Sequence, residues 1–121
     1  MARILIADDE ANLRKVLCAL LERDGHDVCT VPDGQIALQT LETKAIDVLI
    51  TDLKMPEMDG LSLLFAVKKK FSHLPVIVIT AHGTVDSAVS ALKSGAFDYI
   101  TKPFDRDEIR LAVRKAVAEQ I

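Results

Sequence analysis

Short apolar runs alternate along this chain with segments in which apolar residues recur every three or four positions. A short continuous run of apolar, β-branched residues is typical of a buried strand in a parallel sheet. The chain has five such runs, and the second and fifth are the more polar, as expected of edge strands. The predicted strands are residues 4–7, 28–31, 48–51, 76–80 and 99–101.

Between and after these runs, the spacing of apolar residues predicts five helices that each bury one face. Strict alternation of strand and helix predicts a doubly wound α/β fold, with one parallel sheet and helices on both of its faces. The fourth stripe is expected to lie mostly in the core. The stripes are Leu13, Val16, Leu17, Leu20 and Leu21; Ile36, Ala37 and Leu41; Leu61, Leu64 and Phe65; Val85, Ala88, Val89 and Leu92; and Ile109, Ala112, Val113, Ala116 and Val117.

Turn residues punctuate the same pattern. Gly25 and Gly95 follow helical segments at positions suited to C-capping, where a left-handed backbone favours glycine. Asp105 is placed to cap the last helix, and Glu108 three residues later would complete a capping box. We find no internal repeat, linker or low-complexity segment, so residues 1–121 are predicted to form a single domain.

Polar residues stand where four of the predicted strands end. Asp8 and Asp9 follow the first strand and Asp52 follows the third; Thr80 closes the fourth and Lys102 follows the fifth. The carboxyl ends of parallel strands meet at one edge of the sheet, which is where open α/β sheets bind ligands.

Three carboxylates at one sheet edge repel one another, because two unit charges about 4 Å apart cost roughly 4 kcal/mol at an effective dielectric near 20. A divalent cation such as Mg²⁺ would offset that cost, since it prefers oxygen ligands. The set suits phosphoryl chemistry. One carboxylate can accept the group as an aspartyl-phosphate, the cation and lysine can neutralise its charge, and the hydroxyl can donate to its oxygens.

The charge and composition of the chain argue against several classes of partner and location. The formal charge of −3 argues against DNA binding by this chain, and no apolar stretch approaches the roughly 20 residues that span a bilayer. Charges at Arg3 and Asp8 argue against a signal peptide. The cysteines, Cys18 and Cys29, lack metal-ligand or redox-motif spacing, so we expect free, buried or half-buried thiols in a cytoplasmic protein.

These residues resemble the receiver domain of two-component response regulators, in order and spacing along the whole chain. The resemblance implies the flavodoxin-like (βα)5 fold, with a five-stranded sheet in the order 2-1-3-4-5. The chain would then be a signalling switch that catalyses only its own phosphorylation and dephosphorylation. The matching motifs are Asp8-Asp9-Glu10, Asp52 within residues 51–60, Thr80-Ala81 and Lys102-Pro103-Phe104.

The resemblance also implies residue roles. Asp52 would accept a phosphoryl group from a histidine kinase. Asp9, Asp52 and the backbone carbonyl of Lys54 would ligate Mg²⁺ directly, and Asp8 would act largely through water. Lys102 would pair with the phosphoryl oxygens.

A second set of implied roles concerns the switch. Thr80 would bond to the phosphoryl group, and Tyr99 would turn inward as Thr80 moves. The fourth helix, fifth strand and fifth helix would form the signalling face, so some apolar groups of the fourth stripe would be partly exposed there. A cis bond before Pro103 rests on the resemblance alone, because only about 5–6% of such bonds in folded proteins are cis.

A narrower likeness to nitrogen-regulatory receivers lies in Thr80-Ala81-His82-Gly83 and Gly95-Ala96-Phe97-Asp98-Tyr99. Such receivers precede an ATPase domain and a DNA-binding domain in transcription activators. The likeness therefore implies those downstream domains, a sensor histidine kinase as partner, and a phosphorylation-dependent homodimer. His82 is read as a polar loop residue or as a modulator of water attack.

Three other functions fit the sequence less well. An aspartyl-phosphate phosphohydrolase would carry a second aspartate two residues after the nucleophile, where this chain has Lys54. A flavin mononucleotide carrier would need a hydroxyl-rich loop after the first strand, where Asp8, Asp9 and Glu10 would repel a phosphate. A degenerate receiver used only for docking would not retain the complete acidic, hydroxyl and lysine set.

Overall fold

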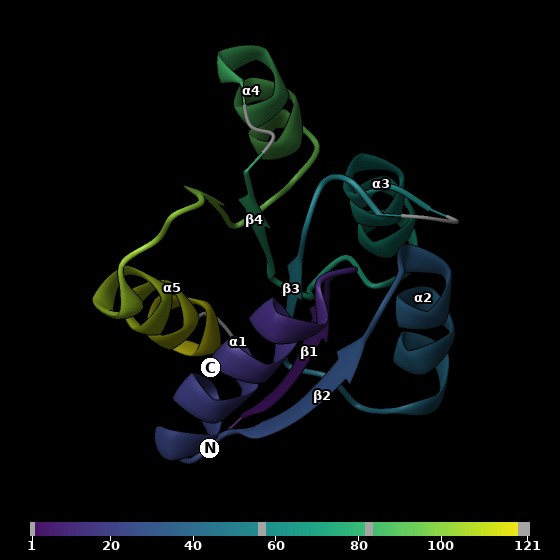
Figure 1. Ribbon diagram of the computed structural model, residues 1–121. Helices are drawn as coiled ribbons and strands as arrows, with labels where there is room; N and C mark the ends of the chain where they lie inside the picture. Colours follow the sequence, from purple (N-terminus) through teal and green to yellow (C-terminus); the bar gives the residue numbers. More distant parts are fainter. Residues whose placement is uncertain (1, 56–57, 82–83, 119–121) are drawn as a thin grey trace.

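The computed structural model of the protein describes residues 2–55, 58–81 and 84–118, and Figure 1 shows its ribbon. Strands and helices alternate strictly along the described chain. The strands are β1 (Arg3–Ala7), β2 (Asp27–Val31), β3 (Val48–Thr51), β4 (Val76–Thr80) and β5 (Asp98–Thr101). The helices are α1 (Ala11–Arg23), α2 (Gly34–Thr43), α3 (Gly60–Lys70), α4 (Val85–Lys93) and α5 (Arg106–Ala118).

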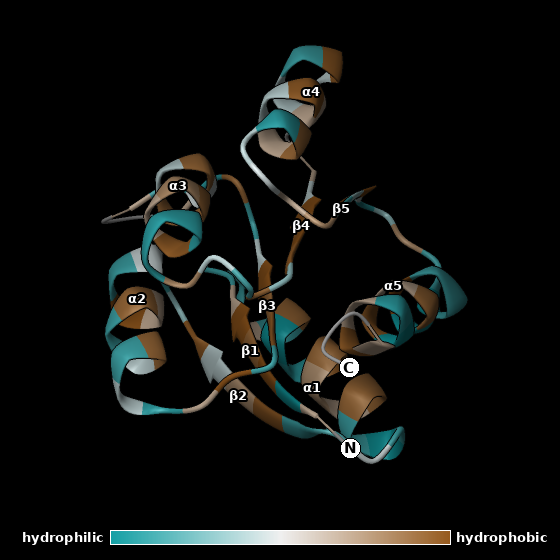
Figure 2. Ribbon diagram, turned by 180° about the vertical axis from the view of Figure 1, so that it is seen from behind, coloured by the Kyte–Doolittle hydropathy of each residue, from teal (hydrophilic) through white to brown (hydrophobic). Residues whose placement is uncertain are grey.

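The five strands form one parallel sheet in the order β2-β1-β3-β4-β5, which confirms the predicted fold and its two edge strands. Helices α1 and α5 cover one face, and α2 and α3 lie on the other, as Figure 1 shows. The central strands are mostly coloured as hydrophobic, whereas each helix carries both hydrophobic and hydrophilic segments (Figure 2).

The sheet divides the apolar interior into two layers. Alternate residues of each strand point to opposite faces, so Leu5 and Leu49 belong to the layer under α2, α3 and α4, and Ile4 and Ile50 to the layer under α1 and α5. The central strands β1, β3 and β4 are almost completely buried, as their continuous apolar runs predicted.

Helix ends follow the predicted punctuation in most places. Gly25 and Gly95 have φ of 90° and 104°, the left-handed region that glycine favours. Asp105 caps α5, but its carboxylate accepts the N–H of Asp107 at 3.0 Å, so the predicted box with Glu108 is not the one seen. A complete capping box lies instead at the start of α4.

The predicted core face of α4 is wrong. Val85, Val89 and Leu92 are 80%, 44% and 50% exposed, and Ala91 is buried instead. The buried stripe is rotated by one residue, about 100° around the helix axis. The residues on that stripe are small, whereas the sequence rule favours larger apolar groups.

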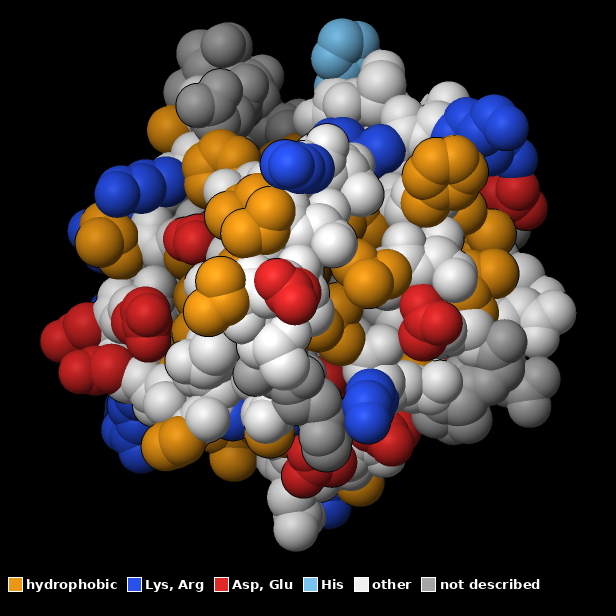
Figure 3. Space-filling view, turned by 90° about the horizontal axis from the view of Figure 1, so that it is seen from above, with side chains coloured by type: hydrophobic (Ala, Val, Ile, Leu, Met, Phe, Trp, Pro, Cys, Tyr) orange, Lys and Arg blue, Asp and Glu red, His pale blue; other side chains and the backbone are white. Residues whose placement is uncertain are grey.

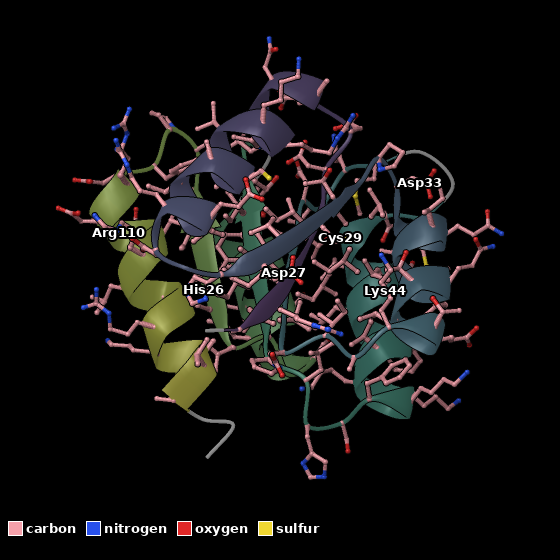
Figure 4. All side chains as sticks on the ribbon, turned by 90° about the horizontal axis from the view of Figure 1, so that it is seen from below. His26, Asp27, Cys29, Asp33, Lys44 and Arg110 are labelled. Carbon is pink, nitrogen blue, oxygen red and sulfur yellow. The ribbon has the colours of Figure 1, made fainter. Side chains whose placement is uncertain are left out.

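Several other stripe residues are also exposed: Val16, Ile36 and Phe65. Cys18 and Cys29 are free, half-buried thiols, as predicted, and Lys44 Nζ lies 3.8 Å from Cys29 Sγ (Figure 4). Among the described helices, none is long and apolar enough to cross a membrane.

Candidate functional site

Four strand ends bring the predicted site residues together. Asp8 follows β1, Asp52 follows β3, Thr80 ends β4 and Lys102 follows β5. Because these strands are consecutive neighbours in the sheet, their carboxyl ends lie side by side. Asp8, Asp52 and Thr80 are 2%, 3% and 0% exposed, so two carboxylates and a hydroxyl are buried at one point.

The ammonium of Lys102 binds three carboxylates at once. Its Nζ lies 2.9 Å from Asp52 Oδ2, 3.1 Å from Glu10 Oε1 and 3.3 Å from Asp8 Oδ2. An ammonium has three donors, so each has a carboxylate acceptor. Sequence reasoning placed Lys102 and the aspartates here but gave no role to Glu10, although Glu10 stands in the same acidic run.

Both oxygens of Asp52 are held. Oδ1 accepts the backbone N–H groups of Leu53 at 2.6 Å and Lys54 at 3.3 Å, while Oδ2 faces Lys102. The orientation of the carboxylate is therefore fixed by the loop after β3 and by Lys102, which follows β5. Lys54 thus contacts Asp52 through its backbone N–H, whereas the sequence analysis assigned a role to its backbone carbonyl.

The two buried aspartates differ in pKa. Burial would raise the pKa of Asp52, but the hydrogen bonds from Lys102 and Thr80 outweigh burial and lower it. Burial is also the largest influence on Asp8 and prevails, because its bonds to the Glu10 N–H and to Lys102 compensate less, so its pKa is raised. Asp52 is thus held as a carboxylate, which is the form a nucleophile needs.

The pKa of Lys102 responds to the same cluster. Burial of the ammonium would lower its pKa, but the hydrogen bond to Asp52 and the charge of Asp8 outweigh burial and raise it well above the ordinary value. Lys102 therefore stays charged throughout the physiological range.

The acidic groups that gather most closely are not quite those predicted. Oxygens of Asp8, Glu10 and Asp52 all lie within 4.8 Å of one another. Asp9 is exposed and stands outside this cluster of described residues. A set of carboxylate oxygens at this spacing fits the ligand preference of a hard divalent cation such as Mg²⁺.

Local backbone geometry shapes the pocket. The N–H of Glu10 donates to Asp8 Oδ1 at 2.8 Å, which folds the loop after β1 back on its own side chain. Gly60, the first residue of α3, packs against the backbone of Asp52, and a Cβ there would lie 2.7 Å from the Cα of Leu53. The bond between Lys102 and Pro103 is cis, as the resemblance implied.

Tyr99, the residue expected to turn inward as Thr80 moves, lies half-buried in β5 beside Val78 of β4. Its hydroxyl is 2.9 Å from Oγ of Ser87 in α4. Sequence reasoning missed Ser87 because the capping-box signature looks for Glu or Gln three residues after the cap. His82 lies outside the described residues.

Comparison with known proteins gives a consistent result. The response regulator receiver domain family matches residues 4–114. The DNA-binding transcriptional regulator NtrC of Klebsiella pneumoniae is 46% identical over 113 residues, and the regulatory protein AtoC of Escherichia coli is 42% identical over 118. These matches cover 93% and 98% of this chain but only 24% and 26% of the relatives, so the chain spans about a quarter of their length.

Solved structures agree with the sequence matches. A receiver domain from Francisella superposes with a TM-score of 0.94 at 33% identity over the whole of both chains. NtrX from Brucella abortus, in complex with ADP, superposes with a TM-score of 0.92 at 35% identity, covering 98% of this chain and 28% of that one.

Proposed function

The chain belongs to the response regulator receiver domain family of two-component systems and is homologous to the NtrC-type activators, and on that premise we propose that it is a switch driven by phosphorylation of Asp52. The observation that carries the proposal is a buried carboxylate at the sheet edge, with the ammonium of Lys102 2.9 Å from its Oδ2. A signalling switch with this site turns over its own phosphoryl group rather than a separate substrate.

In the proposed reaction, an oxygen of Asp52 attacks the phosphorus of a phosphohistidine on a sensor kinase. The phosphorus–nitrogen bond breaks, the imidazole leaves, and an acyl phosphate forms. Asp52 Oδ2 is the oxygen that Lys102 covers, at 2.9 Å. The ammonium is therefore already beside the position at which phosphoryl charge develops.

Asp8, Asp9, Asp52 and the backbone carbonyl of Lys54 are the groups that would hold Mg²⁺, with Glu10 close to them. When bound, the ion neutralises charge on the transferred phosphoryl oxygens. The closely spaced oxygens of Asp8, Glu10 and Asp52 support the inclusion of Asp8 and Asp52 in this set. Thr80, at the end of β4, would donate its hydroxyl to the phosphoryl group.

The proposed setting follows the NtrC-type relatives. We infer a cytoplasmic protein phosphorylated by a sensor histidine kinase, with ATPase and DNA-binding domains downstream. The output face would be α4, β5 and α5, and phosphorylation would favour a homodimer or a contact with a downstream domain. Figure 3, which views the end of the molecule where α4 lies, shows apolar side chains on that surface. Val85, Val89 and Leu92 are the exposed apolar residues of α4.

Mass spectrometry tests the proposal. Incubation with Mg²⁺ and acetyl phosphate should add one phosphoryl group, and Asp52→Asn should abolish the addition. Asp59→Asn is the matched control, because Asp59 caps α3 nearby through a carboxylate that asparagine can replace. Equal labelling of the Asp52→Asn chain would show that another residue is the acceptor.

A further inference from the structure

Ser87 makes hydrogen bonds that use every donor and acceptor of its hydroxyl. Its Oγ accepts the N–H of Thr84 at 2.8 Å, donates to the carbonyl oxygen of Thr84 at 3.0 Å, and lies 2.9 Å from the hydroxyl of Tyr99. A serine hydroxyl has one donor and two acceptor sites. With the donor directed to Thr84, the hydroxyl of Tyr99 must be the donor to Ser87.

This bond joins two elements of the proposed output face. Ser87 lies in the first turn of α4, inside the capping box formed with Thr84, and Tyr99 lies in β5. The Ser87 hydroxyl therefore takes part in the N-terminal cap of α4 and also accepts the hydrogen bond from the hydroxyl of Tyr99. Tyr99 cannot leave its place without depriving the Ser87 hydroxyl of one hydrogen-bond partner, although the capping box between Thr84 and Ser87 would remain.

The ring also neighbours the proposed phosphoryl sensor. Tyr99 pairs with Val78 of β4, and Thr80 follows two residues later on the same face of the sheet. If the ring turns inward toward Thr80, its hydroxyl must give up the bond to Ser87 unless α4 moves with it. The bond to Ser87 opposes that movement.

We propose that Ser87 is a positioning residue that holds Tyr99 against α4 while Asp52 is a free carboxylate, and that this bond breaks when the chain responds to phosphorylation. The proposal rests on the proposed function of Asp52 and extends it to the residue that sets the threshold of the switch. In physical terms, the tyrosine hydroxyl is either bonded to Ser87 of α4 or released from it when the ring turns toward Thr80.

The composition of the chain supplies a direct probe, because it has one tyrosine and no tryptophan. Intrinsic fluorescence therefore reports on Tyr99 alone. Each variant would be titrated with beryllofluoride in the presence of Mg²⁺, with ¹⁹F NMR recording binding of the probe independently. Ser90→Ala is the matched control, since Ser90 is an exposed serine of the same helix.

Ser87→Ala should shift the tyrosine emission before any beryllofluoride is added, toward the value that the wild type reaches at saturation. The beryllofluoride concentration at the midpoint of the titration should fall by about two- to tenfold, which corresponds to the free energy of one neutral hydrogen bond. Ser90→Ala should match the wild type in both respects. Tyr99→Phe, which leaves the capping box intact, should lower the midpoint measured by ¹⁹F NMR to the same extent.

Unchanged emission and an unchanged midpoint in Ser87→Ala, with beryllofluoride still binding, would overturn the proposal for Ser87. A lowered midpoint in Ser87→Ala but not in Tyr99→Phe would also overturn it, because the effect would then come from the helix cap. Failure of every variant and of the wild type to bind beryllofluoride would instead overturn the proposed role of Asp52.

Discussion

Lys102 and Asp52 form an ion pair across the sheet edge, with Nζ 2.9 Å from Oδ2 and side chains that are only 13% and 3% exposed. Because the same ammonium also contacts Asp8, it compensates two carboxylates that are almost completely buried. The consequence can be measured as stability.

Lys102→Met should lower the free energy of unfolding by about 3–5 kcal/mol near pH 7, the usual cost of removing one partner of a buried ion pair. Urea denaturation would measure it. The loss should shrink at acid pH, because protonation neutralises the carboxylates left unpaired. Lys70→Ala is the control. Lys70 and its partner Glu42 are both well exposed, so this substitution should lower the free energy of unfolding by at most about 1 kcal/mol. Equal small losses in both variants would argue against a tight pair at the site.

Asp8 and Asp9 should behave differently without metal. The raised pKa of Asp8 means that its ionised form costs folding free energy at neutral pH. Asp8→Asn should therefore raise the melting temperature of the metal-free chain at pH 7. That gain should diminish as pH falls through the raised pKa of Asp8 and vanish below the ordinary value of 3.8.

Asp9→Asn should leave the metal-free melting temperature nearly unchanged, because Asp9 is exposed and outside the cluster. Both variants should lose most of the stabilisation that Mg²⁺ gives, which is roughly 2.7 kcal/mol at about 100 times the dissociation constant. Calorimetric melting with Mg²⁺ and with a chelator would separate the two effects. A full Mg²⁺ response in Asp9→Asn would remove Asp9 from the proposed ligands.

Gly60 is expected to be irreplaceable at the start of α3. A Cβ there would overlap the carbonyl oxygen of Asp52 and approach Leu53 Cα to 2.7 Å, so Gly60→Ala must displace the loop that holds Asp52. We expect a loss of about 1–3 kcal/mol in urea denaturation, as for other overpacked sites, together with slower labelling by acetyl phosphate.

Gly25→Ala provides the comparison for Gly60. Nothing lies within 4 Å of a Cβ at Gly25, whose φ is +90°, so that change should cost only backbone strain and leave labelling unaltered. Normal labelling of Gly60→Ala would show that the loop tolerates the extra methyl group.

Thr80→Ala should separate acceptance of the phosphoryl group from the response to it. The variant keeps Asp52 and Lys102 and should still bind beryllofluoride, but it lacks the hydroxyl that would draw the switch toward the site. Amide NMR shifts should then be confined to the strand ends instead of spreading through α4 and β5. Thr101→Ala is the matched control, because Thr101 pairs with Thr80 in the sheet and is exposed. Equally extensive shifts in Thr80→Ala and the wild type would show that another residue couples the site to α4.

The architecture could be predicted because its central signals are strong. Strands β3 and β4 are continuous apolar runs bounded by polar residues, and each ends as predicted, at Thr51 and Thr80. Asp8, Asp52 and Lys102 could be placed together because the order of parallel strands determines which ends are neighbours. The roles assigned to Asp9 and to the carbonyl of Lys54 stay predictions.

What could not be predicted depends on small residues and on single rotations. The face of α4 was misjudged because Ala91, with one methyl group, carries little weight against Val85 and Leu92 in any hydrophobic pattern. Ser87 was missed for a different reason: serine is not the residue that the capping-box signature looks for, and only the position of Tyr99 reveals its second bond. Glu10 could not be paired with Lys102 because they are far apart in sequence and Glu10 is exposed.

The shallow seat of α4 has a consequence for the speed of the response. Among its nine residues, all of them described, Ala91 alone is buried. Each Å² of apolar surface is worth only about 25 cal/mol, so apolar burial alone opposes a tilt of α4 only weakly, and the bond between Ser87 and Tyr99 adds to it. The positions of α4 should interchange on the microsecond to millisecond scale typical of collective motions. A signal lasting seconds would therefore be read as a time-averaged position of the helix, governed by the lifetime of the phosphoryl group.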